Sequence, residues 1–175
     1  MKLTDLLSIA EWIALENEIM EKSGSCANVY DPDGFKIIKD KKWPNKLCSA
    51  INHDKNGQTA ICAPAHQNLA AIAQKTKKGV AQECDAGIVK IVVPLFVNNK
   101  FIGSVGCCGL MLEDGEVESF LINKTMEMDE SEIASLSQDA SVVSEKEAQS
   151  LIDFIQERLD RIIGDFEKKQ SDKKM

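Results

Sequence analysis

Cysteine is the residue type in this sequence that is best suited to chemistry. Six cysteines occur among the 175 residues, and several fall at the ends of predicted helices and strands, where loops gather around a pocket mouth. Cys26 is expected to be a small buried core residue. Thiols at element ends can line a ligand pocket, and as thiolates they can ligate zinc or an iron–sulfur cluster. The cysteines singled out on this basis are Cys48, Cys62, Cys84 and Cys108.

The spacing of the cysteines limits the metal-binding alternatives. No two of them form a C-x-x-C motif, which argues against zinc ribbons, thioredoxin-like sites and ferredoxin runs. Cys48, Cys62, Cys84 and Cys108 form a candidate metal set if the fold brings them together, and His66, four residues after Cys62, could join them. The cofactor is unknown at this point. An iron–sulfur cluster or another Cys-ligated metal is the alternative to a pocket without metal.

A recognisable catalytic set is missing from the sequence. Glu83 and Asp85 flank Cys84, but no Ser/His/Asp or Cys/His/Asn signature accompanies them. The glycines between residues 103 and 109 have no following helix that could hold a phosphate, so they indicate close backbone approach instead. We therefore expect no enzymatic activity. An enzyme with a thiol nucleophile ranks below a ligand-binding protein and below a metal- or cluster-binding protein.

The charge and hydropathy of the chain indicate which binding partners to expect. The net charge of −7 argues against binding to duplex DNA, which requires clustered Lys and Arg. No apolar run approaches the roughly 20 residues that span a bilayer. Acidic residues from Asp5 onward interrupt any secretory leader, so we expect no membrane partner and a cytoplasmic protein with reduced thiols.

Hydrophobic spacing in the first half predicts the elements that position these residues. Leu3 to Met20 has the period of an amphipathic helix. Residues 26–38, with the turn Asp31–Gly34, predict a β-hairpin. Two helices are expected next, one over residues 44–52 and one from Pro64 to Gly79.

A second, more buried hairpin is predicted from Ile88 to Val105. Ile88–Val97 is rich in β-branched residues, Asn98–Lys100 forms a tight turn, and Phe101–Val105 returns. This hairpin is expected at the centre of an antiparallel sheet. The predicted fold class is α+β, with helices packed on one face of the sheet and flanked by N- and C-terminal helices.

The last predicted helix has an apolar residue at every position of a heptad seam. Its start at Ser144 carries a capping box with Glu147. We divide the chain into a main domain, residues 1–143, for which the resemblance described below implies a sensory role, and a C-terminal dimerisation or signalling helix with a frayed Lys-rich tail, residues 144–175. A homodimer through the terminal helices is expected. The two seams are Ala148, Ile152, Ile155, Leu159, Ile162 and Phe166, and Leu3, Leu6, Ala10, Ile13, Asn17 and Met20.

The order of these motifs resembles the PocR-type sensory domain from about Leu3 to the start of the last helix. The resemblance implies a variant of the PAS fold that binds small molecules such as diols. Such domains are usually joined to histidine kinases, diguanylate cyclases or helix-turn-helix regulators. The motifs are Trp43 with Leu47-Cys48, Cys62 with its helix, Cys84-Asp85-Ala86-Gly87 before Val93-Pro94-Leu95, and Gly103 followed by Cys108-Gly109-Leu110.

The resemblance implies a sensor of bacterial or archaeal signal transduction, which binds a small molecule or cofactor and relays the event through its terminal helices. Where the family has Cys-His-Ala-Gly, this chain has Cys84-Asp85-Ala86-Gly87, so its ligand preference is expected to differ. Because no output domain follows, we expect either an excised domain or a stand-alone member with a signalling partner. The predicted ligand-binding wall is Trp43, Cys48, Cys62, Cys84, Asp85, Gly87 and Cys108.

Overall fold

A computed structural model describes residues 1–39 and 42–172 of the chain. Four strands of its sheet are antiparallel, in the order β1 (Cys26–Tyr30), β4 (Lys100–Leu112), β3 (Val89–Val97) and β2 (Val80–Glu83). The short strand β5 (Ser141–Val143) pairs in parallel with the end of β4. The predicted hairpin of residues 88–105 is therefore confirmed at the centre of the sheet.

The turn between β3 and β4 explains why these strands pair locally. Asn98 and Asn99 have φ values of 50° and 61°, in the left-handed region that two-residue hairpin turns require. The return strand is longer than predicted, because β4 continues to Leu112. Cys107 and Cys108 therefore lie within the strand, and their predicted place beyond its end was wrong.

A β-bulge interrupts the pairing of β3 with β4. Val89 pairs with Leu110 while Lys90 pairs with Cys108, so Gly109 is an extra residue without a partner on β3. Gly109 has a φ of +100°, and a Cβ atom there would lie 2.0 Å from Cγ of Pro44. Glycine is thus required both by the backbone conformation and by the close approach of Pro44.

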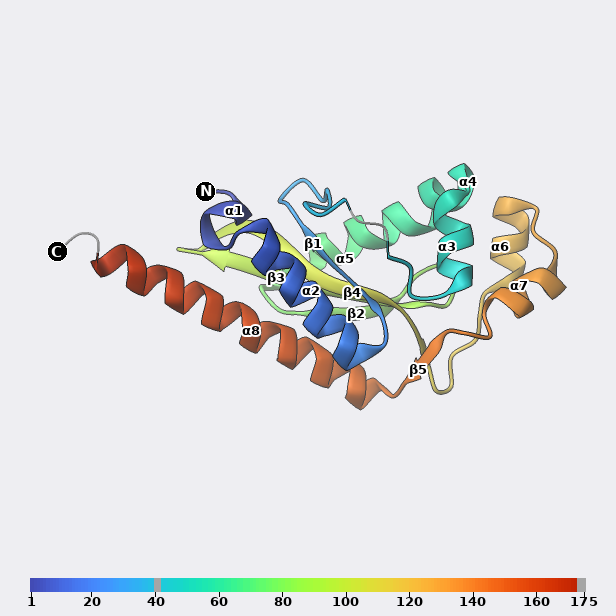
Figure 1. The fold of residues 1–175 in the computed structure, drawn as a ribbon. Helices are drawn as coiled ribbons and strands as arrows, with labels where there is room; N and C mark the ends of the chain where they lie inside the picture. The colour runs from blue at the N-terminus through green and yellow to red at the C-terminus, as the bar shows by residue number, and fades with distance from the viewer. Residues whose placement is uncertain (40–41, 173–175) are drawn as a thin grey trace.

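The two faces of β3 carry different residues and are covered by different helices. Val89, Ile91 and Val93 belong to the main apolar core, which packs against α2 (Ile9–Ser23) and α8 (Glu145–Asp172). Val92, on the opposite face, packs against α5 (Ala63–Thr76). Figure 1 shows α8 along one side of the sheet and α3, α4 and α5 on the other. The expected α+β, PAS-like class is confirmed.

The N-terminal segment is two helices and not the single one predicted. α1 (Leu3–Leu6) ends before Ser8, whose hydroxyl accepts a hydrogen bond from the Glu11 N–H and caps α2. The buried face of α2 is Trp12, Leu15 and Ile19. The seam predicted from Ala10, Ile13 and Asn17 is not part of the buried face within the chain, since Ala10 is exposed, Ile13 is 36% exposed and Asn17 is half-buried.

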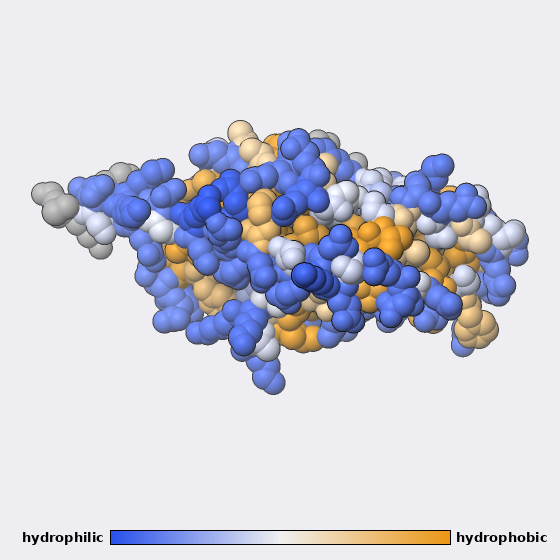
Figure 2. Space-filling view, turned by 90° about the horizontal axis from the view of Figure 1, so that it is seen from below, coloured by the Kyte–Doolittle hydropathy of each residue, from blue (hydrophilic) through white to orange (hydrophobic). Residues whose placement is uncertain are grey.

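The seam of α8 is occupied within its own chain over the first half of the helix. Ala148, Leu151, Ile152, Ile155 and Leu159 are buried in the main core. Seen from the α8 side, the surface is mostly hydrophilic, with hydrophobic side chains in the middle and toward the end formed by α6 and α7 (Figure 2). The helix continues to Asp172, and residues 173–175 lie outside the described part.

Several short helices cover the opposite side of the sheet. α3 (Lys46–His53), α4 (Lys55–Gly57) and the π-helix η1 (Gln58–Cys62) lead into α5. α6 (Ser119–Met126) and α7 (Glu130–Leu136) stand at one end of the molecule. None of the helices in the described ranges is long and apolar enough to cross a membrane.

The first predicted hairpin is only partly formed. The turn at Asp31–Gly34 is present, since the Gly34 N–H donates to the Asp31 carbonyl. The return segment makes one bridge, Tyr30 to Lys36, and no strand follows within the described residues up to 39. β1 instead pairs along its whole length with β4, which is far away in the sequence.

Candidate functional site

The four singled-out cysteines come from different elements and share an intermediate burial. Cys48 lies on α3, Cys62 ends η1, Cys84 follows β2, and Cys108 lies on β4. All four are half-buried, whereas Cys26 and Cys107 are only 4% and 2% exposed. The expectation that Cys26 is a core residue is confirmed.

These four thiols gather in one region. Every pair among them interacts electrostatically, which places the sulfurs within range of one another. Burial raises the pKa of Cys48, Cys62 and Cys84, and neighbouring thiols raise it further. These three side chains are therefore neutral thiols near pH 7. They pack against a second apolar cluster of Leu47, Ile51, Ile61, Ala86, Ile88, Ile122 and Ile133.

Asn45 fixes α3 to the central strand. Its Oδ1 accepts a hydrogen bond from the Cys48 N–H at 2.7 Å, capping the helix, and its Nδ2 donates to the Gly109 carbonyl at 3.0 Å. Asn45 is 5% exposed, so the bond is shielded from water. This link holds Cys48 over the part of β4 that carries Cys108.

Lys90 is the central residue of this region, and the sequence analysis overlooked it. It pairs with Cys108 across β3 and β4 and is half-buried. Alternation along β3 turns it away from Val89 and Ile91, toward the helices that carry the thiols. The signal was available in the sequence, because Lys90 is the one charged residue in the apolar run 88–97.

Tyr30 and His66 complete the polar surroundings of Lys90. The Lys90 Nζ lies 5.7 Å from the centroid of the Tyr30 ring. The His66 ring, from α5, stacks on the Tyr30 ring, with the two ring centroids 3.8 Å apart and 26° between the ring planes. Tyr30 is 6% exposed and His66 7%. Tyr30 from β1, Lys90 from β3 and His66 from α5 therefore meet on the α5 side of the sheet.

Charge and burial set the protonation of these three groups. Burial raises the pKa of Tyr30 to about 12. Burial, followed by repulsion from Lys90 and Lys36, lowers the pKa of His66 to about 3. Burial by itself lowers the pKa of Lys90, but the Tyr30 oxygen and the thiol sulfurs outweigh it and raise that pKa. At neutral pH the region therefore holds a cationic lysine beside a neutral imidazole and a neutral phenol.

The remaining predicted wall residues lie in other surroundings. Trp43 is half-buried against the His53 ring, with centroids 5.3 Å apart. Asp85 is exposed on the turn after Cys84. Gly87 has a φ of +76°, and a Cβ there would lie 2.0 Å from the Glu116 carbonyl oxygen, so its packing partner is backbone. Asp85 and Gly87 lie on the turn that begins at Cys84, where the Gly87 N–H donates to the Cys84 carbonyl at 2.9 Å.

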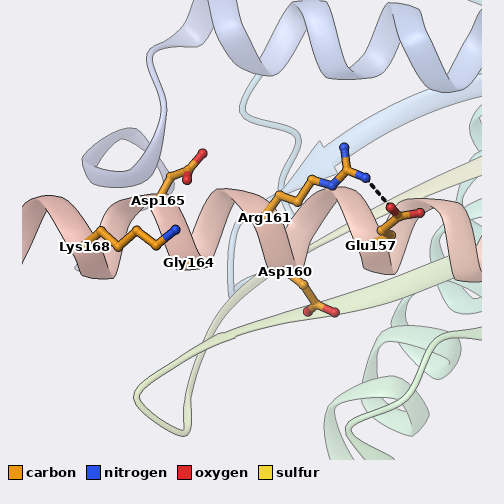
Figure 3. Close-up of a pocket in the computed structure, with 6 residues that line it drawn as sticks. All are labelled: Glu157, Asp160, Arg161, Gly164, Asp165 and Lys168. Atoms are coloured by element: carbon orange, nitrogen blue, oxygen red, sulfur yellow. Dashed lines mark hydrogen bonds and ion pairs between the residues drawn. The ribbon is translucent and has the colours of Figure 1, made fainter.

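Among the residues that the structure describes, the four thiols form no metal-binding group, and two surface hollows lie elsewhere. Among residues 1–39 and 42–172, no three His, Cys, Asp or Glu side chains are grouped so that they could hold a metal ion. One shallow hollow, on α8, is lined from Glu157 to Lys168, with side chains of one helix pointing to different sides (Figure 3). Another lies between β2 and α8, on the far side of the sheet from Lys90.

Helices on one side of a largely antiparallel sheet, terminal helices on the other, and buried polar groups between the sheet and α5 are the features of a PAS-like α+β domain. Residues 5–164 match a family model described as the sensory domain found in PocR. The chain therefore belongs to the PocR sensory-domain family. Comparisons with curated proteins and with solved structures gave no significant match.

Proposed function

We propose that the protein is a non-catalytic cytoplasmic sensor that binds a small molecule between the sheet and the helices α3–α5. Cys48, Cys62 and Cys84 contribute apolar, neutral thiol surface, Cys108 adds a fourth thiol beside Lys90, and Lys90 contributes the polar centre. Ligand sites have this composition, an apolar lining with a few convergent polar groups.

His66 is the observation that carries the proposal. Both of its ring nitrogens are buried, and neither has a hydrogen-bond partner among the residues that the structure describes. A buried polar atom without a partner costs about 1–3 kcal/mol, so such atoms are rare unless another molecule satisfies them. The π-helix η1 supports the same location, because π-helical turns are frequent at functional sites and this one ends at Cys62.

The relay is proposed to pass through β3. Lys90 faces the ligand side, while its neighbours Val89 and Ile91 belong to the core beneath α2 and α8. The terminal helices are joined by Arg158, whose guanidinium contacts Glu18 at 2.9 Å. A ligand that prefers one position of β3 would therefore shift the packing of residues 145–159. We retain 1–143 and 144–175 as the proposed sensing and output parts.

The alternative is a Cys-ligated metal or iron–sulfur sensor. The electrostatic coupling of the four thiols favours it, and the lack of a metal-binding group in the described residues counts against it. Native mass spectrometry of anaerobically purified protein separates the two. We expect no mass gain from iron, sulfide or zinc, and a brown protein carrying a cluster mass would instead establish the alternative.

The ligand site is tested by an NMR screen of small neutral and charged molecules. Binding should shift the amide resonances of Tyr30, Cys62 and Lys90, and His66→Gln should weaken binding at least tenfold. His53→Gln, at an exposed histidine, is the matched control and should bind as the wild type does. Shifts confined to the α8 hollow, or equal binding by His66→Gln, would contradict the proposal.

A further inference from the structure

The surroundings of Tyr30 concentrate positive charge in a protein that is otherwise acidic. Lys90 lies over its ring, the imidazole of His66 stacks on it, and Lys36 bridges to it through the backbone. The net charge of the whole chain is −7. Lys90 therefore lies close to the buried phenol, and Lys90 and Lys36 both act on the imidazole stacked upon it, while the Lys36 ammonium itself lies over the Trp43 ring.

Among residues 1–39 and 42–172, no carboxylate forms an ion pair with Lys90. The groups that act electrostatically on Lys90 are Tyr30 and thiols, and those that act on His66 are Lys90 and Lys36. Neither ion pair found in the described ranges involves Lys90. A half-buried ammonium surrounded by neutral groups is unusual, because such a charge is ordinarily paired.

The hydrogen-bonding groups around Lys90 define the kind of ligand that could bind there. Lys90 offers an ammonium, the neutral imidazole of His66 offers one N–H and one acceptor nitrogen, and Tyr30 offers a hydroxyl. The thiols of Cys48, Cys62 and Cys84, on the apolar cluster, offer no charge and suit a short hydrocarbon group. A charged head beside an apolar wall fits a molecule with one anionic end.

We propose, on the basis of the sensor function above, that the ligand is a small organic monocarboxylate. Its carboxylate would pair with Lys90 and accept hydrogen bonds from His66 and Tyr30, while its alkyl part would contact the thiols. A charge-assisted hydrogen bond is about twice as strong as a neutral one, so Lys90 should dominate the selection of an anion over a neutral isostere.

Isothermal titration with propionate, propionamide and propylamine tests this assignment in a buffer free of phosphate. Propionate should bind the wild type at least tenfold more tightly than propionamide, and propylamine should not bind. Lys90→Met should abolish the preference, and Lys90→Arg should keep it. Lys100→Met, at an exposed lysine at the start of β4, is the matched control and should behave as the wild type does.

Several outcomes would overturn the assignment. Equal binding of propionate and propionamide, or an unchanged preference in Lys90→Met, would remove the role of Lys90. Inorganic phosphate that binds more tightly than propionate would exclude a carboxylate ligand. If Lys90→Met fails to fold by circular dichroism, Tyr30→Phe takes its place and should lower propionate affinity several-fold. Neutral diols that shift Tyr30 and Cys62 while no carboxylate does would refute this inference and leave the sensor function standing.

Discussion

The imidazole of His66 stacks face to face on the phenol of Tyr30, with 3.8 Å between ring centroids. The contact joins α5 to β1 across the α5 side of the sheet. It also removes the imidazole from water while Lys90 and Lys36 oppose its protonation. Folding therefore selects the neutral form of His66, and this has a consequence for stability against pH.

Stability should fall as the solution is acidified below pH 6.5. The pKa of His66 is lowered from 6.5 to about 3, so between these values the unfolded chain binds a proton that the folded chain does not. The free energy of unfolding should decrease with falling pH by at most about 1.4 kcal/mol per unit from this group. Urea unfolding at several pH values measures the slope. His66→Phe should show a shallower slope, and an identical slope would contradict the lowered pKa.

Gly109→Ala should destabilise the fold by about 1–3 kcal/mol, because the residue has φ +100° and its methyl group would meet Pro44. Gly164→Ala provides the matched control. Nothing lies within 4 Å of a Cβ at that position, and replacing glycine inside a helix stabilises by roughly 0.5–1 kcal/mol. Denaturant unfolding of both variants measures the contrast. A Gly109→Ala protein as stable as the wild type would show that the bulge tolerates a side chain.

The core thiols of Cys26 and Cys107 should be alkylated much more slowly in the folded protein than in the unfolded chain. Burial raises the pKa of Cys26 from 9.0 to about 11, so its thiolate fraction at pH 8 falls about 100-fold. Burial likewise raises the pKa of Cys107 to about 12. Iodoacetamide labelling followed by peptide mass spectrometry should therefore find both residues at least 100-fold slower in folded than in guanidinium-unfolded protein. Rapid labelling of Cys26 in the folded protein would contradict its place in the core.

Dimerisation through the terminal helices remains a prediction, and the structure changes how it must be tested. Ile155 is fully buried in its own chain, so a charge there would disturb the fold. Ile9 and Ile13 are 41% and 36% exposed on α2 and provide a cleaner probe. Sedimentation equilibrium should give a dimer for the wild type and a monomer for Ile13→Glu. Lys22→Glu, on the same helix, controls for added charge, and a monomeric wild type would refute the prediction.

The parts of the fold that were predictable are those fixed by local pattern. The hairpin from Ile88 to Val105 follows from a β-branched run and an Asn-Asn turn, and α8 from its heptad and its cap at Ser144. β5 and β2 were missed because each is three or four residues long and gains its place only by pairing with β4 or β3. Pairing of β1 with β4 depends on contacts between distant segments, which local spacing does not encode.

The candidate site was predictable in its thiols and not in its polar centre. Element ends pointed to Cys48, Cys62 and Cys84, which the structure brings together. Lys90 was overlooked because a lysine in an apolar run is usually explained by an exposed strand face. The buried face of α2 was also not fixed by spacing. Ala10 and Ile13 have helical spacing as good as that of Trp12, Leu15 and Ile19, and packing selects the latter, including the Trp12 N–H bond to the Leu3 carbonyl.

The extra residue at Gly109 reverses the alternation of side chains along this part of β4. From Ser104 to Cys108 the even-numbered residues face the α5 side, whereas the even-numbered Leu110 faces the core beneath α8. A substitution in this stretch alters one side chain, but gain or loss of a single residue would exchange every polar and apolar position up to Leu112. Related chains should therefore differ here in residue type and keep the same length.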